Sequence, residues 1–329
     1  MDNSKIAYTI EQLSQKIGIA STCIEQDIAL SKRTWIHRGG VAKWWFRPTN
    51  YKDLLRIGIF LYKEQCQFDI IGHTSNIYFT NSYNPDIILD TKLVKGIKFE
   101  NNEIICDAGT PISQIAKKCV QLGICGYEGL IDLPGTVGAA TVNNSGCFGC
   151  EISNLVKEIE ILTPNGLRRL TNAELNYTHR NSILKSGGFR GIVLRVWLNA
   201  FKYPHKINTL LSIAAKNHEI RVRTQEKPNH NLGSTFTFTT LKQNYQHFIV
   251  RIITRFLNIC KTSPSIILKV QKYTYLFLQN KLHLARYISN KNLNTYLFID
   301  EYADRQFPHY VEFIETIYKD AKLEIEIKK

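Results

Sequence analysis

Residues 127–149 read Y-E-G-L-I-D-L-P-G-T-V-G-A-A-T-V-N-N-S-G-C-F-G, and no other stretch of the chain is as informative. Glycine recurs among small residues and asparagine, so backbone N–H groups can approach a ligand without interference from a Cβ atom. Successive N–H groups in turns of this kind can cradle a pyrophosphate. The alternative interpretation is a loop-rich β domain with tight turns and no ligand.

The common nucleotide-binding motifs are missing from the chain. No G-x-G-x-x-G follows a strand with an acidic residue further on, and there is no G-K-[ST] phosphate loop. If these glycines hold a nucleotide, they hold it in another way.

Residues 133–151, L-P-G-T-V-G-A-A-T-V-N-N-S-G-C-F-G-C-E, resemble the I-P-G-T-V-G-G-A-x-x-Q-N-x-G-A-Y-G-x-E segment of the UDP-N-acetylenolpyruvoylglucosamine reductase family. Two other segments agree and keep the family order. Residues 34–43, T-W-I-H-R-G-G-V-A-K, are similar to its N-T-F-x-I-G-G-x-A-K segment. Residues 71–76, I-G-H-T-S-N, stand where the family has G-G-G-S-N around the FAD pyrophosphate. The resemblance covers residues 30–200 well and recurs in short pieces beyond.

The fold implied by this resemblance is α+β. It consists of a two-lobed FAD-binding domain of the vanillyl-alcohol-oxidase (PCMH) type over residues 20–205, with the lobes divided near residue 90. A smaller α+β substrate-binding domain over residues 206–329 follows.

FAD is the implied cofactor, with NADPH as the hydride donor and no metal. The residues that match the family's cofactor-binding segments are Gly72, His73, Thr74, Ser75, Asn76, Pro134, Gly135, Thr136, Gly138, Ala139, Asn144, Gly146, Gly149 and Ile192. His73 replaces a glycine of the pyrophosphate loop. Covalent attachment of the flavin to this histidine is a separate hypothesis. Acid precipitation that gives colourless protein and a yellow supernatant would exclude it.

A reductase of this family passes hydride from NADPH through the flavin to the enolpyruvyl double bond of a UDP-sugar. The cofactor carries the redox chemistry, and the protein supplies a cation at the carboxylate and a proton for the neighbouring carbon. Arg180, in Y-T-H-R-N-S-I-L-K, aligns with the residue that grips the carboxylate. Ser234, in N-L-G-S-T-F, aligns with the proton donor, and Glu326, in L-E-I-E-I, with a glutamate that acts beside the arginine. Without the resemblance these would be an ordinary surface arginine, a turn serine and an exposed glutamate.

Several positions depart from the family pattern. His179 and Asn181 flank the arginine where the family has Tyr and Asp. After Ser234 the lysine and proline of the family are absent, and Ile325 replaces the proline of the last motif. FAD binding is therefore better supported than UDP-sugar binding. Two alternatives follow: a diverged FAD oxidoreductase acting on another anionic substrate, and a silent homologue that keeps the fold.

The net charge of +14 is concentrated in one part of the chain. Residues 206–291 contain fourteen Lys and Arg but only Glu219 and Glu226. Such a stretch attracts an anion, and the UDP diphosphate is the partner expected here. A basic nucleic-acid-binding protein is the alternative, but no helix-turn-helix, zinc finger or RNA-binding motif supports it.

Cysteine usage and hydropathy indicate a cytoplasmic protein. The eight cysteines are expected to be free thiols, and the pair Cys147 and Cys150 lacks the further ligands of a zinc site. No signal-peptide pattern is found at the N-terminus. No stretch approaches the roughly 20 apolar residues of a membrane span, so no membrane partner is expected. The oligomeric state is not indicated.

Local patterns predict several elements. Thr49 or Asn50 is expected to cap a helix whose apolar face includes Leu54, Ile57 and Leu61. Thr110 is expected to cap a helix from Pro111 to Gly123. Residues 156–170 predict a β-hairpin, and residues 306–322 a helix.

Overall fold

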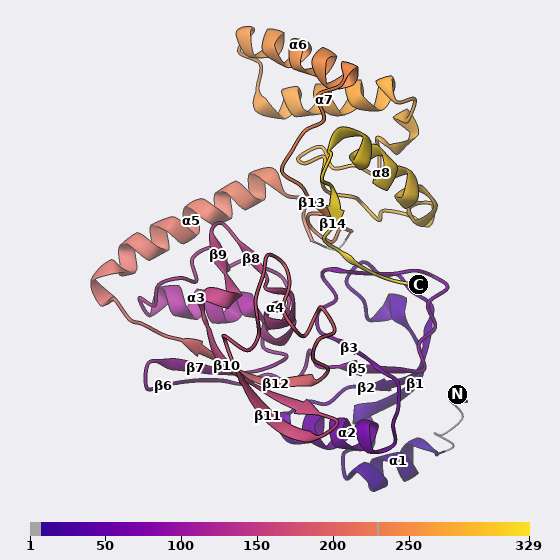
Figure 1. Cartoon of the computed structure of the whole chain (residues 1–329), viewed down its shortest axis with the longest axis vertical. Helices are drawn as coiled ribbons and strands as arrows, with labels where there is room; N and C mark the ends of the chain where they lie inside the picture. Colours follow the sequence, from indigo (N-terminus) through magenta and orange to yellow (C-terminus); the bar gives the residue numbers. More distant parts are fainter. Residues whose placement is uncertain (1–7, 229) are drawn as a thin grey trace. The chain divides into compact units, whose positions relative to one another are not determined.

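The computed structural model describes residues 8–228 and 230–329 (Figure 1). Contacts within the chain divide it into two compact units, each with helices and strands, which confirms the α+β class. Unit 1 comprises residues up to 32, 40–74 and 83–219, and unit 2 comprises residues 33–39, 75–82 and 220–329. The functional domains expected over residues 20–205 and 206–329 stay a prediction.

The first sheet of unit 1 has the strand order β1-β2-β5-β3. Its strands are β1 (Ile24–Ala29), β2 (Val41–Phe46), β5 (Ile87–Asp90) and β3 (Asp69–Ile71). β5 lies between two parallel neighbours, and all four of its residues are buried. A parallel strand covered on both faces requires such a continuous apolar run.

Helices α1 (Ile10–Ile17) and α2 (Tyr51–Lys63) pack with this sheet. Asn50 caps α2, as predicted, because its side chain accepts the backbone N–H of Asp53 at 3.0 Å. Leu54, Ile57 and Leu61 are fully buried and join the sheet residues in one hydrophobic core. Local capping and periodicity were sufficient to predict this helix.

The second sheet of unit 1 has the order β11-β10-β12-β7-β6 and is antiparallel throughout. Its strands are β6 (Ile97–Glu100), β7 (Glu103–Asp107), β10 (Val156–Thr163), β11 (Gly166–Thr171) and β12 (Ile192–Asn199). The predicted hairpin is confirmed as β10 and β11. Its turn ends at Gly166, whose φ of 106° suits glycine, and the Thr163 hydroxyl donates to the Gly166 carbonyl at 2.9 Å.

Unit 1 also contains α3 (Ile112–Gln121), α4 (Val137–Asn143) and the short pair β8 (Gly146–Cys147) and β9 (Cys150–Glu151). The prediction that Thr110 caps α3 is wrong. Pro111 occupies the cap position, and the Thr110 hydroxyl donates to the Gly96 carbonyl at 3.0 Å. The Thr110 hydroxyl therefore bonds to Gly96, fourteen residues earlier, and not to the start of the helix.

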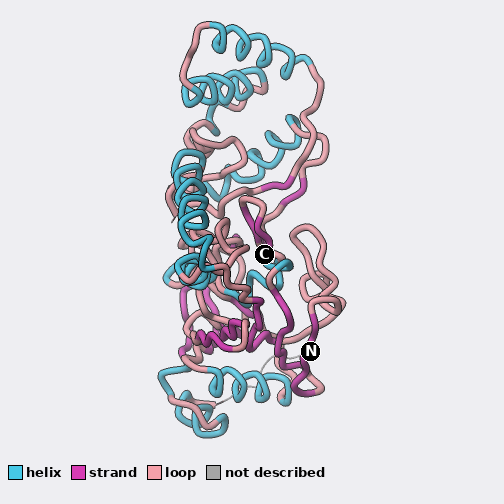
Figure 2. The backbone as a smooth tube through the Cα atoms, turned by 90° about the vertical axis from the view of Figure 1, so that its left-hand side faces the viewer, coloured by secondary structure: helices cyan, strands magenta, loops and turns pink. Residues whose placement is uncertain are grey.

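Unit 2 contains α6 (Tyr245–Ile259), α7 (Pro264–Leu278) and α8 (Ala303–Ile317), and Figures 1 and 2 both show α6 and α7 side by side. Two small sheets complete it. β13 (Phe236–Thr237) pairs antiparallel with β14 (Lys322–Leu323), and β15 (Glu326–Lys328) pairs parallel with β4 (Ile77–Phe79). The division between the units falls within α5 (Ile207–Thr224).

Helix α8 ends earlier than the sequence predicted. It stops at Ile317 rather than at residue 322, and Tyr318 is extended, with φ −117° and ψ 133°. The ring of Tyr318 stacks on that of Phe238, with 3.6 Å between the centroids. A tertiary contact therefore ends the helix where its local pattern would have continued.

Two further features concern the cysteines and the lengths of the helices. All eight cysteines are free thiols, as predicted. Among residues 8–228 and 230–329, no helix combines the length and apolarity that crossing a bilayer requires.

An aromatic cluster forms the centre of unit 2. Tyr296 lies 4.9 Å from Tyr310 and 5.0 Å from Phe298 between ring centroids, and Tyr78 lies 4.9 Å from Phe298. Tyr78 lies on β4, more than 200 residues before these partners. The cluster thus binds an early segment of the chain to a late one.

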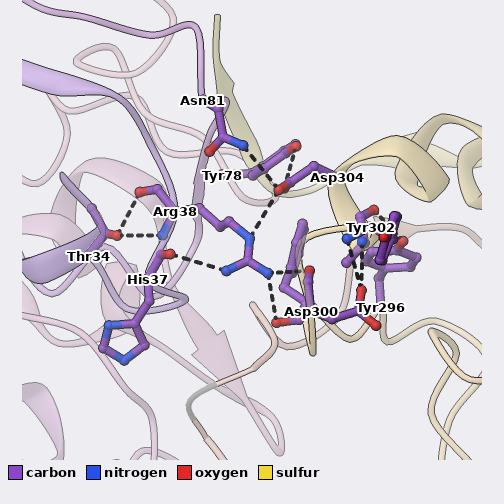
Figure 3. A network of polar contacts seen from close by, with 11 residues as sticks. Thr34, His37, Arg38, Tyr78, Asn81, Tyr296, Asp300, Tyr302 and Asp304 are labelled. Atoms are coloured by element: carbon purple, nitrogen blue, oxygen red, sulfur yellow. Dashed lines mark hydrogen bonds and ion pairs between the residues drawn. The ribbon is translucent and has the colours of Figure 1, made fainter. Parts of the chain in front are cut away.

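Arg38 adds a polar connection of the same kind (Figure 3). Its Nε lies 3.1 Å from Asp304 Oδ2, and its Nη2 donates to the carbonyl of Asp300 at 2.5 Å. The Tyr78 hydroxyl donates to the other oxygen of Asp304 at 2.9 Å. Burial, and then the charge of Asp304, raises the pKa of Tyr78, so its hydroxyl remains a donor.

We expect Arg38→Ala to lower the free energy of unfolding by about 2–3 kcal/mol, because the largely buried Asp304 loses its positively charged partner, keeping only Tyr78 and Asn81, and the Asp300 carbonyl loses its donor. Arg286→Ala is the matched control, since Arg286 pairs with Asp300 at 2.5 Å but its side chain is 62% exposed. Such an exposed pair contributes less than about 1 kcal/mol. Urea unfolding measures both values, and equal losses in the two variants would contradict this account of unit 2.

Candidate cofactor and substrate site

Two of the predicted cofactor segments meet inside unit 1. The first begins at Gly72, directly after β3, and the second surrounds Thr136. A Cβ atom added to Gly72 would lie 2.6 Å from Thr136 Oγ1, which is closer than real Cβ contacts allow. The structure therefore brings together two segments that lie 64 residues apart and that were predicted separately to bind FAD.

Thr136 starts helix α4. Its side chain accepts the backbone N–H of Ala139 at 3.3 Å and so caps the helix. Gly135 precedes it with a φ of 120°, a conformation that side chains rarely adopt. Gly138 donates its N–H to the Ala108 carbonyl at 2.9 Å, which holds the helix close to the end of β7. Pro134 is exposed beside this turn.

Asn144 ends the same helix and fastens it to two other segments. It is buried, and its φ of 44° and ψ of 54° place it in the left-handed region. Its Nδ2 donates to the Thr178 carbonyl at 2.9 Å, and its Oδ1 accepts the Ser153 N–H at 3.2 Å. Thr178 lies two residues before Arg180, so a predicted cofactor residue positions the turn that carries the predicted carboxylate-binding residue.

The remaining positions of the glycine segment form a tight hairpin. Gly146 and Cys147 pair with Glu151 and Cys150. A Cβ on Gly146 would lie 2.3 Å from the Cys150 carbonyl oxygen, so only glycine fits there. Gly149 occupies the exposed turn with a φ of 77°.

Ile192, the last predicted cofactor residue, is fully buried in the hydrophobic core of unit 1 with Leu162 and Leu194. Its side chain packs against residues of that core. The role of Ile192 toward a cofactor stays a prediction.

Basic residues that the sequence prediction missed surround the first segment. His73 is partly buried, and burial, followed by the charges of Lys95 and Lys92, lowers its pKa. Lys92 also lies 3.3 Å from the fully buried Asp90, which Arg47 approaches at 3.9 Å. Lys92 follows the end of β5, next to the end of β3. The meeting of adjacent parallel strand ends is the signal that would have identified it.

Arg180 lies in unit 1, in the turn between Thr178 and Asn181. Its φ of 57° is left-handed, and Lys185 donates to its carbonyl at 3.0 Å. His179, beside it, approaches Glu151 at 3.7 Å. The turn is thus held by contacts to the glycine segment on one side and by Lys185 on the other.

Ser234 and Glu326 lie in unit 2, near the predicted loop residue Asn76. The Glu324 N–H donates to the Thr235 carbonyl at 2.9 Å, which extends the pairing of β13 with β14 to the residue after Ser234. Asn76 accepts the N–H of Glu326 at 2.9 Å and donates from its side chain to the Glu324 carbonyl at 3.1 Å. Asn76 and Glu326 are therefore hydrogen-bonded to each other, and the same stretch is bonded to Thr235, the residue after Ser234.

The side chain of Glu326 is 43% exposed and pairs with Lys328 at 3.1 Å. Ser234 precedes the buried Thr235 and follows Gly233, whose φ is 76°. Both predicted functional groups are thus attached to ordered strand ends. Ser75, the remaining predicted loop residue, is partly buried beside Asn76.

Comparison with known proteins agrees with this arrangement. Residues 42–171 match the family described as FAD binding domain, a range that contains both Gly72 and Thr136. The fold is similar to the crystal structure of UDP-N-acetylenolpyruvylglucosamine reductase from Thermus caldophilus, with a TM-score of 0.65. That match covers 93% of this chain and 99% of the other at 18% identity, and it shows the fold alone.

Curated relatives named UDP-N-acetylenolpyruvoylglucosamine reductase extend the match. The protein of Caulobacter sp. (strain K31) is 31% identical over 218 residues, or 64% of this chain and 68% of the relative. That of Caldanaerobacter subterraneus subsp. tengcongensis is 28% identical over 63% of this chain and 68% of the relative. That of Latilactobacillus sakei subsp. sakei is 29% identical over 48% and 53%.

The aligned part of the chain thus spans from about half to about two thirds of these relatives. The ordered motifs, the contact between the two cofactor segments and these identities agree with one another. The chain belongs to the UDP-N-acetylenolpyruvoylglucosamine reductase family.

Proposed function

We propose that the chain is an FAD-dependent oxidoreductase that reduces UDP-N-acetylenolpyruvoylglucosamine to UDP-N-acetylmuramate with NADPH, a step of peptidoglycan precursor synthesis. The observation that carries the proposal is the contact between Gly72 and Thr136, which assembles two FAD segments in a member of this family. We further propose that the reaction takes place in the cytoplasm, where NADPH and nucleotide sugars are available.

The residues of unit 1 fit a flavin nucleotide. The missing side chain at Gly72 and the left-handed Gly135 let the backbones of the two segments lie close together, while Val137, Gly138 and Ala139 at the start of α4 already donate their N–H groups within the chain. A backbone without Cβ atoms lets a phosphate approach closely. Lys92 and Lys95 add positive charge beside His73. We propose that Gly72, His73 and Thr136 hold the diphosphate, and that Asn144 and Gly146 keep the following turn in place.

Bound FAD would supply the hydride transfer from NADPH to the enolpyruvyl double bond. The chain must then bind the substrate carboxylate and deliver one proton to the neighbouring carbon, so that hydride and proton together saturate the double bond. We propose that Arg180 binds the carboxylate, since its planar guanidinium matches that group. Ser234 donates the proton from its hydroxyl, and Glu326 acts on the carboxylate end of the substrate.

Gly72→Ala is expected to weaken FAD binding about 10- to 100-fold, because the added methyl group clashes with Thr136 and separates the two segments. In Gly72→Ala with Thr136→Ala the nearest remaining atom of residue 136 is the Cβ, at 3.5 Å. Because Thr136 is itself placed at the diphosphate, Thr136→Ala alone is the reference, and adding Gly72→Ala to it should weaken binding much less than Gly72→Ala does in the unchanged protein. Flavin fluorescence titration of protein stripped of FAD measures both.

The control is Gly188→Ala, whose added methyl group meets only the flexible side chain of Ile183 at 3.0 Å. This variant should bind FAD like the unchanged protein. An equal loss of affinity from Gly72→Ala in the unchanged protein and in Thr136→Ala, with every variant folded by circular dichroism, would disprove the proposed contact between the segments.

The affinity for FAD is expected to rise as the pH falls from 7.5 to 6. Without flavin, burial and the two lysines hold the pKa of His73 below its ordinary value of 6.5. A diphosphate opposes the lysines and raises that pKa, so FAD and a proton bind together. His73→Gln should flatten this pH dependence, whereas the exposed His205→Gln should leave it unchanged. Identical slopes in all three proteins would refute the placement of the diphosphate at His73.

Arg180→Ala, Ser234→Ala and Glu326→Gln are each expected to lower kcat by about 10²- to 10⁴-fold while leaving the flavin absorbance intact. NADPH oxidation with the enolpyruvyl UDP-sugar, followed anaerobically, provides the rate. Glu324→Gln is the matched control, because it neutralises a carboxylate two residues away on the same strand end.

The same experiment distinguishes the alternatives. Flavin that NADPH bleaches but the enolpyruvyl UDP-sugar does not reoxidise would indicate another substrate. Unchanged rates in all three variants would refute the roles proposed for Arg180, Ser234 and Glu326.

A further inference from the structure

Helix α6 exposes a row of large apolar side chains along one face. Tyr245, Phe248, Ile252, Phe256 and Ile259 are between 51% and 74% exposed. Their spacing of three or four residues places them above one another on the helix surface. A row of this length, unlike a scattered exposed leucine, marks an interaction surface.

The neighbouring helix α7 carries a second row. Ile266, Tyr273 and Phe277 are 52%, 42% and 69% exposed. On its other side Lys272 is 1% exposed and donates to the carbonyls of Ala285 and Ile288, both at 3.0 Å. These bonds anchor one side of α7 in unit 2 and fix the outward direction of its apolar row.

A groove of about 620 Å³ joins the two rows. Ile249 and Ile253 line it from α6, and Val270, Tyr273 and Phe277 line it from α7. Tyr273 and Phe277 thus belong both to the groove and to the exposed row. The two helices therefore form one continuous apolar face, called here the hairpin face.

Positive charge borders the hairpin face. Residues 227–299 contain ten Lys and Arg and no Asp or Glu, although Lys272 is buried and Lys281 and Arg286 pair with Glu312 and Asp300. Arg251 and Arg255 lie on α6 beside the exposed row, and the Arg251 guanidinium lies 5.9 Å from the ring of Phe248. Lys269 lines the groove. The surface combines an apolar centre with a basic border.

We propose that the hairpin face binds the surface of a bilayer containing anionic lipids. Helices that lie in the interface of a bilayer show this pattern, with apolar side chains among the acyl chains and Lys or Arg at the headgroups. The 15 residues of each helix span about 22 Å, too short to cross a bilayer but sufficient to lie on it.

A nucleic acid fits this face less well. Five of the eight residues in the two exposed rows are aromatic and offer planes for stacking on bases, but the groove between the rows is lined by the aliphatic side chains of Ile249, Ile253 and Val270, which offer no such plane. A lipid surface accepts aliphatic and aromatic side chains alike and provides the negative charge that the basic border requires. Binding of the hairpin face to lipid does not depend on the proposed reductase activity.

Sedimentation of the full chain with vesicles tests this proposal. We expect binding to phosphatidylcholine vesicles that contain roughly 30% phosphatidylglycerol, and little binding to vesicles of phosphatidylcholine alone. Phe248→Gln with Phe256→Gln should weaken binding at least about 10-fold, since each exposed ring enters the acyl region. Arg251→Gln with Arg255→Gln should weaken it about 30-fold and reduce its dependence on salt.

The controls are Leu167→Gln, which removes a 51% exposed apolar side chain from β11, and Lys63→Gln, which removes a charge from α2. Neither should alter vesicle binding, and circular dichroism establishes that every variant is folded. Absence of binding to anionic vesicles would overturn the proposal. So would binding that the hairpin variants leave unchanged. Tighter binding to an oligonucleotide, or a concentration-dependent dimer abolished by the phenylalanine substitutions, would assign the face to another partner.

Discussion

The close approach of Gly72 to Thr136 is the constraint on which the candidate site depends. It places the end of β3 against the start of α4, and α4 is short, with seven residues and a length of about 10 Å. At its other end Asn144 holds Thr178, two residues before Arg180. A single short helix thus connects the predicted diphosphate site to the turn that carries the predicted carboxylate-binding residue.

Features with local causes were predictable from the sequence. The cap at Asn50 and the hairpin of β10 and β11 both arise from residues close together in the chain. Features that depend on distant partners were missed. Thr110 binds Gly96 instead of capping α3, and the stacking of Tyr318 on Phe238 ends α8 five residues early.

The candidate site shows the same division. Gly72, Thr136 and Asn144 were recognisable from motifs, but their mutual contacts were not, because those contacts join strand ends and helix ends far apart in sequence. Lys92 and Lys95 were missed since nothing near them in the sequence resembles a motif. The sequence located a basic stretch over residues 206–291, but it did not indicate that Arg251, Arg255 and Lys269 lie at an apolar face.

Unit 2 is assembled from residues 33–39, 75–82 and 220–329, with 137 residues of unit 1 between the early pieces and the late one. During synthesis at about 5–20 residues per second, the early pieces wait on the order of ten seconds for their partners. Tyr78 then has no aromatic neighbours, and the edge of β4 has no strand to pair with until residues 326–328 leave the ribosome. Unit 2 therefore folds late and with high contact order. Its apolar segments are exposed until synthesis is complete, and chaperones are most needed at that stage.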